Sequence, residues 1–221
     1  MTSKSAPSEK SVTAPPADCR RCARLSKFRD DNRQQYPDFF NNPVPSFGGL
    51  DARLLVVGLA PGLKGANRTG RPFTGDYAGD LLYPTLIEYG FARGTFGASI
   101  DDGLQMVDCR ITNSVRCVPP ENKPTGEEVT SCRPFLINEI NAMPNLRVVL
   151  ALGVLAHNAT LVALGERRAS WKFTHGGMHA LPNSLTLADS YHCSRYNTNT
   201  GRLTEAMFHD VVDAVAKKLG R

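Results

Sequence analysis

A short apolar run followed by a long loop rich in glycine and proline is the feature that most constrains the fold of this chain. The run, residues 54–57, reads LLVV and lies between Arg53 and Gly58. An uninterrupted apolar run with β-branched residues is typical of a strand buried on both faces, as in a parallel sheet. We therefore predict a buried strand at residues 54–57.

The loop after this strand is too rich in breakers for helix: Gly58, Pro61, Gly62, Gly65, Gly70, Pro72 and Gly75. Open α/β sheets bind their ligands at the carboxyl ends of strands, and glycines let the backbone approach a ligand closely. An ordinary surface loop is the alternative, but long loops in compact domains are usually functional or disordered. We interpret it as part of a functional site. It offers polar, aromatic and acidic side chains to one cavity: Asn67, Arg68, Thr69, Phe73, Thr74 and Asp76.

The rest of the chain alternates strands with helices. Further strands are predicted at residues 110–115, 146–152 and 184–191, and helices at 78–90, 125–142, 153–165 and 204–219. Thr125 with Glu128 three residues later is a capping-box signature. Pro84 disfavours a helix interior, so the first of these helices is expected to kink there or to begin near Tyr83. The pattern predicts the α/β class: a single three-layer αβα domain with a central, mostly parallel four-stranded sheet.

Composition sets the outer limits of the domain and its class of partner. Residues 1–17 hold almost nothing to bury and are predicted to be a disordered tail, which leaves residues 18–221 as the folded domain. The net charge of +5 is compatible with a polyanionic partner. No run of about 18 apolar residues and no signal-peptide segment is present. We therefore expect a cytoplasmic protein, a monomer without membrane contact, which in a prokaryote would be associated with the nucleoid.

Six cysteines raise the question of a metal site: Cys19, Cys22, Cys109, Cys117, Cys132 and Cys193. A disulfide framework is not expected in a cytosolic protein. Cys19 and Cys22 are spaced to bind one metal centre, but the second CxxC pair of a zinc ribbon is missing. Four thiolates from separate segments suit an iron–sulfur cluster equally well. Spacing alone supports a metal site and buried free thiols about equally.

Two long motifs carry a family resemblance. GLAPG followed by GANRTGRPFTGD, and HCSRYNTNTGRL near the carboxyl terminus, are similar to the two active-site motifs of the family-5 (B-type) uracil-DNA glycosylases. The resemblance covers roughly residues 19–219. It implies base-excision repair by hydrolysis of the N-glycosidic bond of uracil in DNA, with base flipping. It also implies tolerance of hypoxanthine and other deaminated or modified bases.

Such an excision needs a carboxylate or water-positioning group beneath the sugar and a donor at the uracil oxygen. The resemblance implies that Asp76 is the catalytic carboxylate and that His192 stabilises the charge developing on uracil. The position that is acidic or an amide in several related families is Ala60 here. From the residues alone, an N-cap role for Asp76 and a structural role for His192 are the alternatives.

A flipped base also needs a platform and a reader of its edge. Phe73 matches the family's aromatic platform, and Asn113, at the end of a strand, offers both a donor and an acceptor to the uracil edge. Ala60, Pro61 and Gly62 are expected to line the same pocket and to leave it roomy. The alternatives are a core phenylalanine and a structural asparagine turn.

The second motif and the first loop supply candidate contacts to DNA. Phosphate and minor-groove contacts are expected from five residues: Asn67, Arg68, Ser194, Arg195 and Asn197. Cys193 stands where the family has proline, and this change frees the backbone there. His175 matches a family position near the pocket, without a defined role.

The resemblance also selects among the cysteines. Cys19, Cys22, Cys117 and Cys132 match the family's ligand positions and imply a structural [4Fe-4S] cluster near DNA. Cys109 and Cys193 have no match and are expected to be ordinary thiols.

A reading from another class is a non-catalytic nucleic-acid-binding protein that holds an iron–sulfur cluster or zinc. The basic charge and the cysteines fit that reading as well. It does not account for Asp76, Asn113 and His192 all lying at predicted strand ends on the ligand-binding edge of the sheet.

Overall fold

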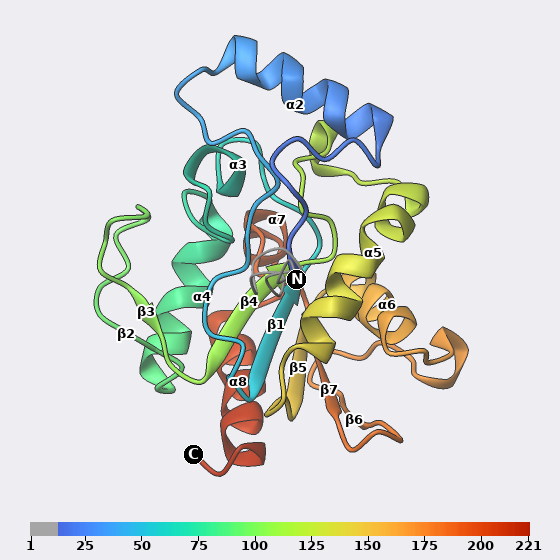
Figure 1. The fold of residues 1–221 in the computed structure, drawn as a ribbon. Coiled ribbons are helices and arrows are strands. Elements are labelled where there is room, and N and C mark those ends of the chain that lie inside the picture. Colours follow the sequence, from blue (N-terminus) through green and yellow to red (C-terminus); the bar gives the residue numbers. More distant parts are fainter. Residues whose placement is uncertain (1–12) are drawn as a thin grey trace, which may run out of the picture.

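The computed structural model describes residues 13–221, and its elements are arranged around one central sheet (Figure 1). Residues 1–12, most of the predicted tail, lie outside the described residues. Residues 13–17 pack on the domain, because Arg116 donates to the carbonyl of Thr13 (3.5 Å) and Arg33 to that of Ala17 (3.2 Å). The predicted tail is therefore too long. Composition alone does not reveal that distant arginines hold these carbonyl groups.

The central sheet has five strands in the order β4-β1-β5-β7-β6. The first four are parallel, and β6 pairs antiparallel with β7 at the edge. The four predicted strands are confirmed, but the predicted strand count was one short: the three-residue β6 is too brief and too exposed to leave a pattern. The strands are β1 (Leu54–Gly58), β4 (Cys109–Asn113), β5 (Val148–Leu152), β6 (Met178–Ala180) and β7 (Thr186–Ser190).

Helices cover both faces of the sheet, which confirms the three-layer prediction (Figure 1). On β1, Leu54 and Val56 pack in the cluster formed with α4 and α8, whereas Leu55 and Val57 pack in the cluster formed with α5 and α6. The run is apolar throughout because both of its faces are buried. The long helices are α2 (Ala23–Gln35), α4 (Tyr77–Glu88), α5 (Gly126–Asn141), α6 (Val154–Ala163) and α8 (Glu205–Lys218).

The remaining helices and strands are short. No helix within residues 13–221 has both the length and the apolar character needed to cross a membrane. The short elements are the helices α3 (Ala66–Thr69) and α7 (Arg195–Asn199), the 3-10 turns Pro120–Asn122 and Arg168–Ser170, and the two-stranded sheet of β2 (Ala92–Arg93) with β3 (Gln105–Met106).

Two local predictions need correction. The loop after β1 contains one helical turn, α3, which ends at Gly70 in a left-handed conformation (φ 81°). Helix α4 begins at Tyr77 and continues through Pro84, so the predicted helix from residue 78 is confirmed and the alternative start near Tyr83 is wrong. Its true start is fixed by Asp76, which caps the first turn. The capping box at Thr125 and Glu128 is confirmed.

A buried ion-pair network joins α5 to β4. Glu139, with 0% exposure, accepts hydrogen bonds from Arg110 Nε (2.7 Å) and from Arg116 Nη2. Burial alone would raise the pKa of Glu139, but the charges of the two arginines hold that pKa below its ordinary value. The network fixes β4 and the segment after it, and hence the position of Asn113.

We predict that Glu139→Gln lowers the free energy of unfolding by about 3–5 kcal/mol, because it leaves two buried arginines without their counter-charge. Urea denaturation at neutral pH measures this loss. Glu127→Gln, an exposed change on the same helix, is the matched control and should cost about 0.5 kcal/mol or less. Equal losses in the two variants would contradict the role assigned to the network.

Candidate active site and cysteine centre

A cavity of about 700 Å³ opens at the carboxyl-terminal edge of the sheet. Its walls come from the loop after β1, from the end of β4 and from the segment after β7. Asp76, Asn113 and His192 all line it, although they are far apart in the sequence. Parallel strands bring their carboxyl ends to one edge, which is why these residues meet.

Phe73 forms one wall and adopts a strained backbone conformation (φ 51°). Its ring lies so close to Gly58 that a Cβ there would be 2.5 Å from Phe73 Cζ. Glycine is therefore required at position 58. The ring centroid lies 5.9 Å from that of His192, with the planes tilted by 34°. The aromatic side chain thus faces the cavity and not only the core.

The turn that carries Phe73 is clamped by Arg71. This arginine is 4% exposed and donates two hydrogen bonds to Asp102 (2.8 and 2.6 Å) and one to Thr74 Oγ1 (2.8 Å). Tyr83 adds a hydrogen bond from its hydroxyl to the carbonyl of Pro72 (2.6 Å). These contacts offset the cost of the left-handed backbone at Phe73, which is of order 1–3 kcal/mol.

Asn113 ends β4 and is buried. Its Oδ1 is a buried acceptor without a hydrogen-bond partner within the described part of the chain. A Cβ on Gly58 would lie 2.4 Å from this atom, so the oxygen sits beside the ring of Phe73. An unpaired buried acceptor is costly, and Asn113 lines the cavity, where this oxygen can accept a hydrogen bond from a donor bound there.

Asp76 combines both roles considered for it. Its Oδ1 accepts from the Ala78 amide (3.2 Å) as the N-cap of α4. Its carboxylate also lines the cavity and approaches the backbone so closely that a Cβ on Gly65 would be 2.2 Å from Oδ2. Burial raises the pKa of Asp76.

His192 follows β7 and lines the cavity. Burial lowers the pKa of His192 to about 4. The imidazole is therefore neutral at pH 7 and can donate one N–H to an oxygen that gains negative charge. Asn197 fixes the backbone here by donating to the His192 carbonyl (2.8 Å).

The segment after His192 forms α7. Ser194 caps that helix by accepting from the Asn197 amide (3.4 Å), and Arg195 lies over the ring of Tyr77 (5.5 Å) at the rim of the cavity. Cys193 is fully buried, so the side chain that replaces proline packs into the core while the cap geometry of α7 is kept.

The remaining residues predicted from the sequence differ in where the structure places them. Ala60, Pro61 and Gly62 line the cavity. Arg68 is exposed. Asn67 is only 1% exposed and donates to Asn41 Oδ1 (2.8 Å). The predicted contact of Asn67 with DNA therefore has no exposed side chain to support it: its position in a polar loop did not reveal that the chain before β1 covers it.

Three further residues bear on the site but were missed or left undefined. Tyr196 is 72% exposed next to Arg195, and Lys64 lines the cavity. Neither spacing nor residue type distinguishes them from ordinary surface side chains. His175 lies outside the cavity: it stacks on Tyr191 (4.8 Å, 3°) and accepts from the Tyr191 amide (3.1 Å).

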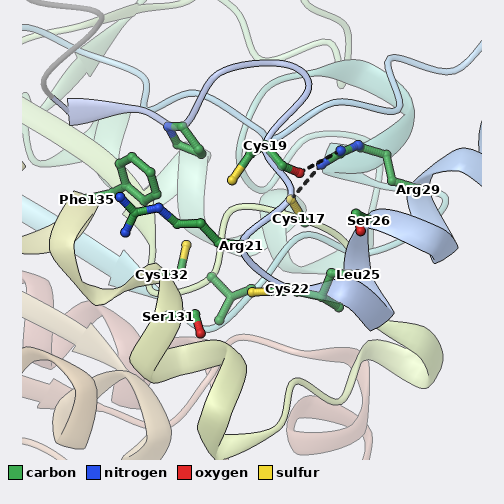
Figure 2. Close-up of a pocket in the computed structure, with 12 residues that line it drawn as sticks. Cys19, Arg21, Cys22, Leu25, Ser26, Arg29, Cys117, Ser131, Cys132 and Phe135 are labelled. Carbon is green, nitrogen blue, oxygen red and sulfur yellow. Dashed lines mark hydrogen bonds between the residues drawn. The ribbon is translucent and has the colours of Figure 1, made fainter.

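The four predicted ligand cysteines converge at the other candidate centre. Figure 2 shows their sulfur atoms facing one space between α2 and α5. All four are free thiols. Arg29 donates to Cys117 Sγ (3.5 Å) and to the Cys19 carbonyl (2.8 Å). Burial raises the pKa values of Cys22, Cys117 and Cys132, that of Cys117 to about 12. Thiolates at this depth therefore require a cationic partner.

A tighter group of metal-binding side chains exists elsewhere. Within residues 13–221, the only three such residues whose ligand atoms lie within 4.8 Å of one another are His157, His179 and Asp189. These atoms are already paired with one another, because the Asp189 carboxylate is hydrogen-bonded to both imidazole rings (2.7 and 2.8 Å). The cysteine sulfurs are spread more widely. Four sulfurs around one zinc ion would lie about 3.8 Å apart, given Zn–S bonds of about 2.3 Å.

Comparison with known proteins agrees with this geometry. The family model of the uracil DNA glycosylase superfamily matches residues 45–216. A type-5 uracil-DNA glycosylase from Thermus thermophilus is 43% identical over 88% of this chain and 90% of its own length. Proteins with the same description from Pyrobaculum aerophilum and Mycobacterium leprae are each 40% identical, over 91% of this chain and 89% and 92% of their own lengths.

We predict that His192 titrates near pH 4, because burial disfavours its charged form. In the unfolded chain this histidine titrates at about pH 6.5. Between pH 6.5 and 4 the unfolded state therefore binds the proton and the folded state does not, so the free energy of unfolding falls as the pH drops through this range. NMR titration of labelled imidazoles measures the pKa, and His192→Gln assigns the signal. A midpoint near 6.5 would contradict the burial argument.

Proposed function

Because the chain belongs to the uracil DNA glycosylase superfamily, we propose that it hydrolyses the bond between uracil and deoxyribose in DNA. The observation that carries this proposal is the single cavity shared by Phe73, Asp76, Asn113 and His192. A non-catalytic binding protein has no need for a carboxylate, a neutral imidazole and an unpaired acceptor in one crevice.

Base recognition follows from two side chains. The extruded uracil stacks on Phe73, and its N3–H donates to the Asn113 Oδ1 that is left without a partner within the described residues. Extrusion is required because the reacting bond is inaccessible inside a duplex. The small side chain of Ala60 in the wall leaves room for other deaminated or modified bases such as hypoxanthine.

Bond cleavage places opposite charges on the two fragments. As the C1′–N1 bond breaks, its electron pair stays with uracil, and the neutral His192 donates a hydrogen bond to the oxygen that becomes negative. The Asp76 carboxylate stabilises the cationic sugar and orients the water that attacks C1′. That water keeps one proton in the new C1′ hydroxyl and releases the other to solvent, and the departing uracil anion takes up a proton from solvent. A neutral donor suits this role because it pays no cost for burying a charge before the reaction.

We further propose that the four cysteines hold a [4Fe-4S] cluster. An all-thiol donor set, the wide spread of the sulfurs and the apolar residues Leu25, Val115 and Phe135 around them fit an iron–sulfur cluster better than a single ion. The cluster would supply a structural crosslink between the start of α2, the segment after β4 and α5. Arg29 neutralises part of its charge through Cys117.

The substrate sets the remaining expectations. In a prokaryote, an enzyme acting on chromosomal DNA would work in the cytoplasm, associated with the nucleoid. We expect action as a monomer, since the cavity already contains the carboxylate, the imidazole and the aromatic ring that the proposed reaction uses. Ser194 and Arg195 line the cavity and Tyr196 beside them is exposed, so this segment is where we expect the DNA backbone to be bound.

The proposal is tested with a uracil-containing oligonucleotide, treated with alkali after incubation to reveal strand cleavage at excised sites. Asp76→Asn and His192→Gln should each lower the single-turnover rate about a hundredfold or more with little change in DNA affinity. Asp80→Asn, an exposed carboxylate on the first turn of the same helix, is the control and should retain activity. Unchanged rates in both variants would refute the roles assigned here.

The cluster proposal predicts a brown protein with about four iron and four sulfide per chain when it is purified without oxygen. Cys132→Ser should lose both the iron and the visible absorption. Cys109→Ala, a buried thiol away from the centre, should keep them. Stoichiometric zinc in place of iron in the wild-type protein would overturn the assignment.

A further inference from the structure

A second cleft lies beside the active-site cavity. It has a volume of about 730 Å³ and shares Leu59 and His192 with that cavity. Its walls are the start of α6, the segment after α6 and the residue Tyr191 that follows β7. The two hollows therefore adjoin at His192.

The cleft is positively charged. Arg168, Lys172 and Arg202 line it, all three are exposed, and none is paired with a carboxylate in the part of the chain that the structure describes. Among residues 13–221, no acidic side chain contributes to its walls. Unpaired cations around a hollow complement a phosphodiester backbone.

Its inner wall is aromatic. Trp171, Phe173 and Tyr191 line it, and Phe173 lies 5.9 Å from Tyr191. Arg202 covers the ring of Tyr191 (4.7 Å). Aromatic rings interleaved with cations are the combination that binds unpaired nucleotides, because every base has a face on which to stack.

This wall is held in place from behind. The carbonyl of Trp171 accepts from His157 Nε2 (2.9 Å), and His157 Nδ1 bonds the buried Asp189 (2.7 Å). The indole N–H donates to Glu166 (3.2 Å). Trp171 is thus positioned before a ligand arrives, which lowers the entropy cost of binding.

We propose that this cleft holds the nucleotide next to the damaged one, unstacked, with its base on the Trp171 wall and its phosphate among the three cations. The proposal rests on the proposed function. The backbone of an intact duplex needs a basic surface but no concave aromatic wall, whereas an unpaired nucleotide uses both. The cleft therefore favours single-stranded or locally melted DNA as the substrate.

The test uses single-stranded uracil oligonucleotides in which one neighbouring base is replaced by an abasic spacer, on either the 5′ or the 3′ side. For the wild-type protein, kcat/KM should fall about tenfold when the spacer replaces the base in the cleft. A spacer four nucleotides away is the matched control. Trp171→Ala should also lower kcat/KM on the intact strand about tenfold. In this variant the spacer should have no further effect, since the substitution and the spacer remove the same stacking contact.

A conservative change in the wall and two exposed changes keep the test independent of folding. Trp171→Phe should restore most of the loss, and the exposed change Lys172→Ala should weaken binding and reduce its salt dependence. Arg93→Ala removes an exposed cation on β2, away from the cleft, and should leave activity unchanged. Uracil excision that is insensitive to spacers on both sides would overturn the cleft proposal alone.

Direct binding separates this proposal from the excision chemistry. Trp171 is the sole tryptophan of the chain, so its fluorescence reports on the cleft. Titration of the Asp76→Asn variant with the intact strand should quench this emission, and the spacer strand should quench it much less. Equal quenching by both strands would contradict base stacking there. If the wild-type protein excised no uracil, the proposed function would be refuted. The titration would still show whether the cleft binds the base of a neighbouring nucleotide.

Discussion

The parallel alignment of β4, β1, β5 and β7 is the constraint on which the rest of the structure depends. Because these strands run the same way, the chain leaves the sheet at one edge each time, and every such exit adds residues to the same surface. Asn113 leaves β4 there, His192 leaves β7, and the loop with Asp76 leaves β1. The helices on both faces bury the strands and leave that edge as the place where polar side chains gather.

The loop after β1 shows how rigidity and strain are combined at this edge. Phe73 has a left-handed backbone that is unfavourable in isolation, and Arg71 holds the turn by bonding Asp102 and Thr74. The ring is pressed against Gly58, the last residue of the strand. The aromatic platform is thus rigid before any base arrives. Preorganisation of this kind supports catalysis, since no free energy is spent on ordering the site during the reaction.

Much of this arrangement could be predicted, and the exceptions have physical causes. The apolar run at Leu54 and the cap at Thr125 locate elements because local chemistry determines them. The edge strand β6 was missed, since its pairing with β7 leaves no local pattern. The start of α4 was left between residue 78 and Tyr83, and the cap at Asp76 decides for the first. The burial of Asn67 depends on Asn41, a contact across 26 positions that no periodicity contains. The second cleft is likewise visible only once the segment after α6 is folded against Tyr191.

The central claim is that one extruded base occupies the cavity between Phe73, Asn113 and His192. A crystal structure of the protein with DNA containing 2′-fluoro-2′-deoxyuridine, whose glycosidic bond resists hydrolysis, tests it most directly. The account predicts the uracil ring stacked on Phe73, its N3 within hydrogen-bond distance of Asn113 Oδ1, and an oxygen facing His192. A uracil bound outside this cavity would contradict the claim. So would a uracil that remains stacked in the DNA double helix although the protein is bound at that position of the DNA.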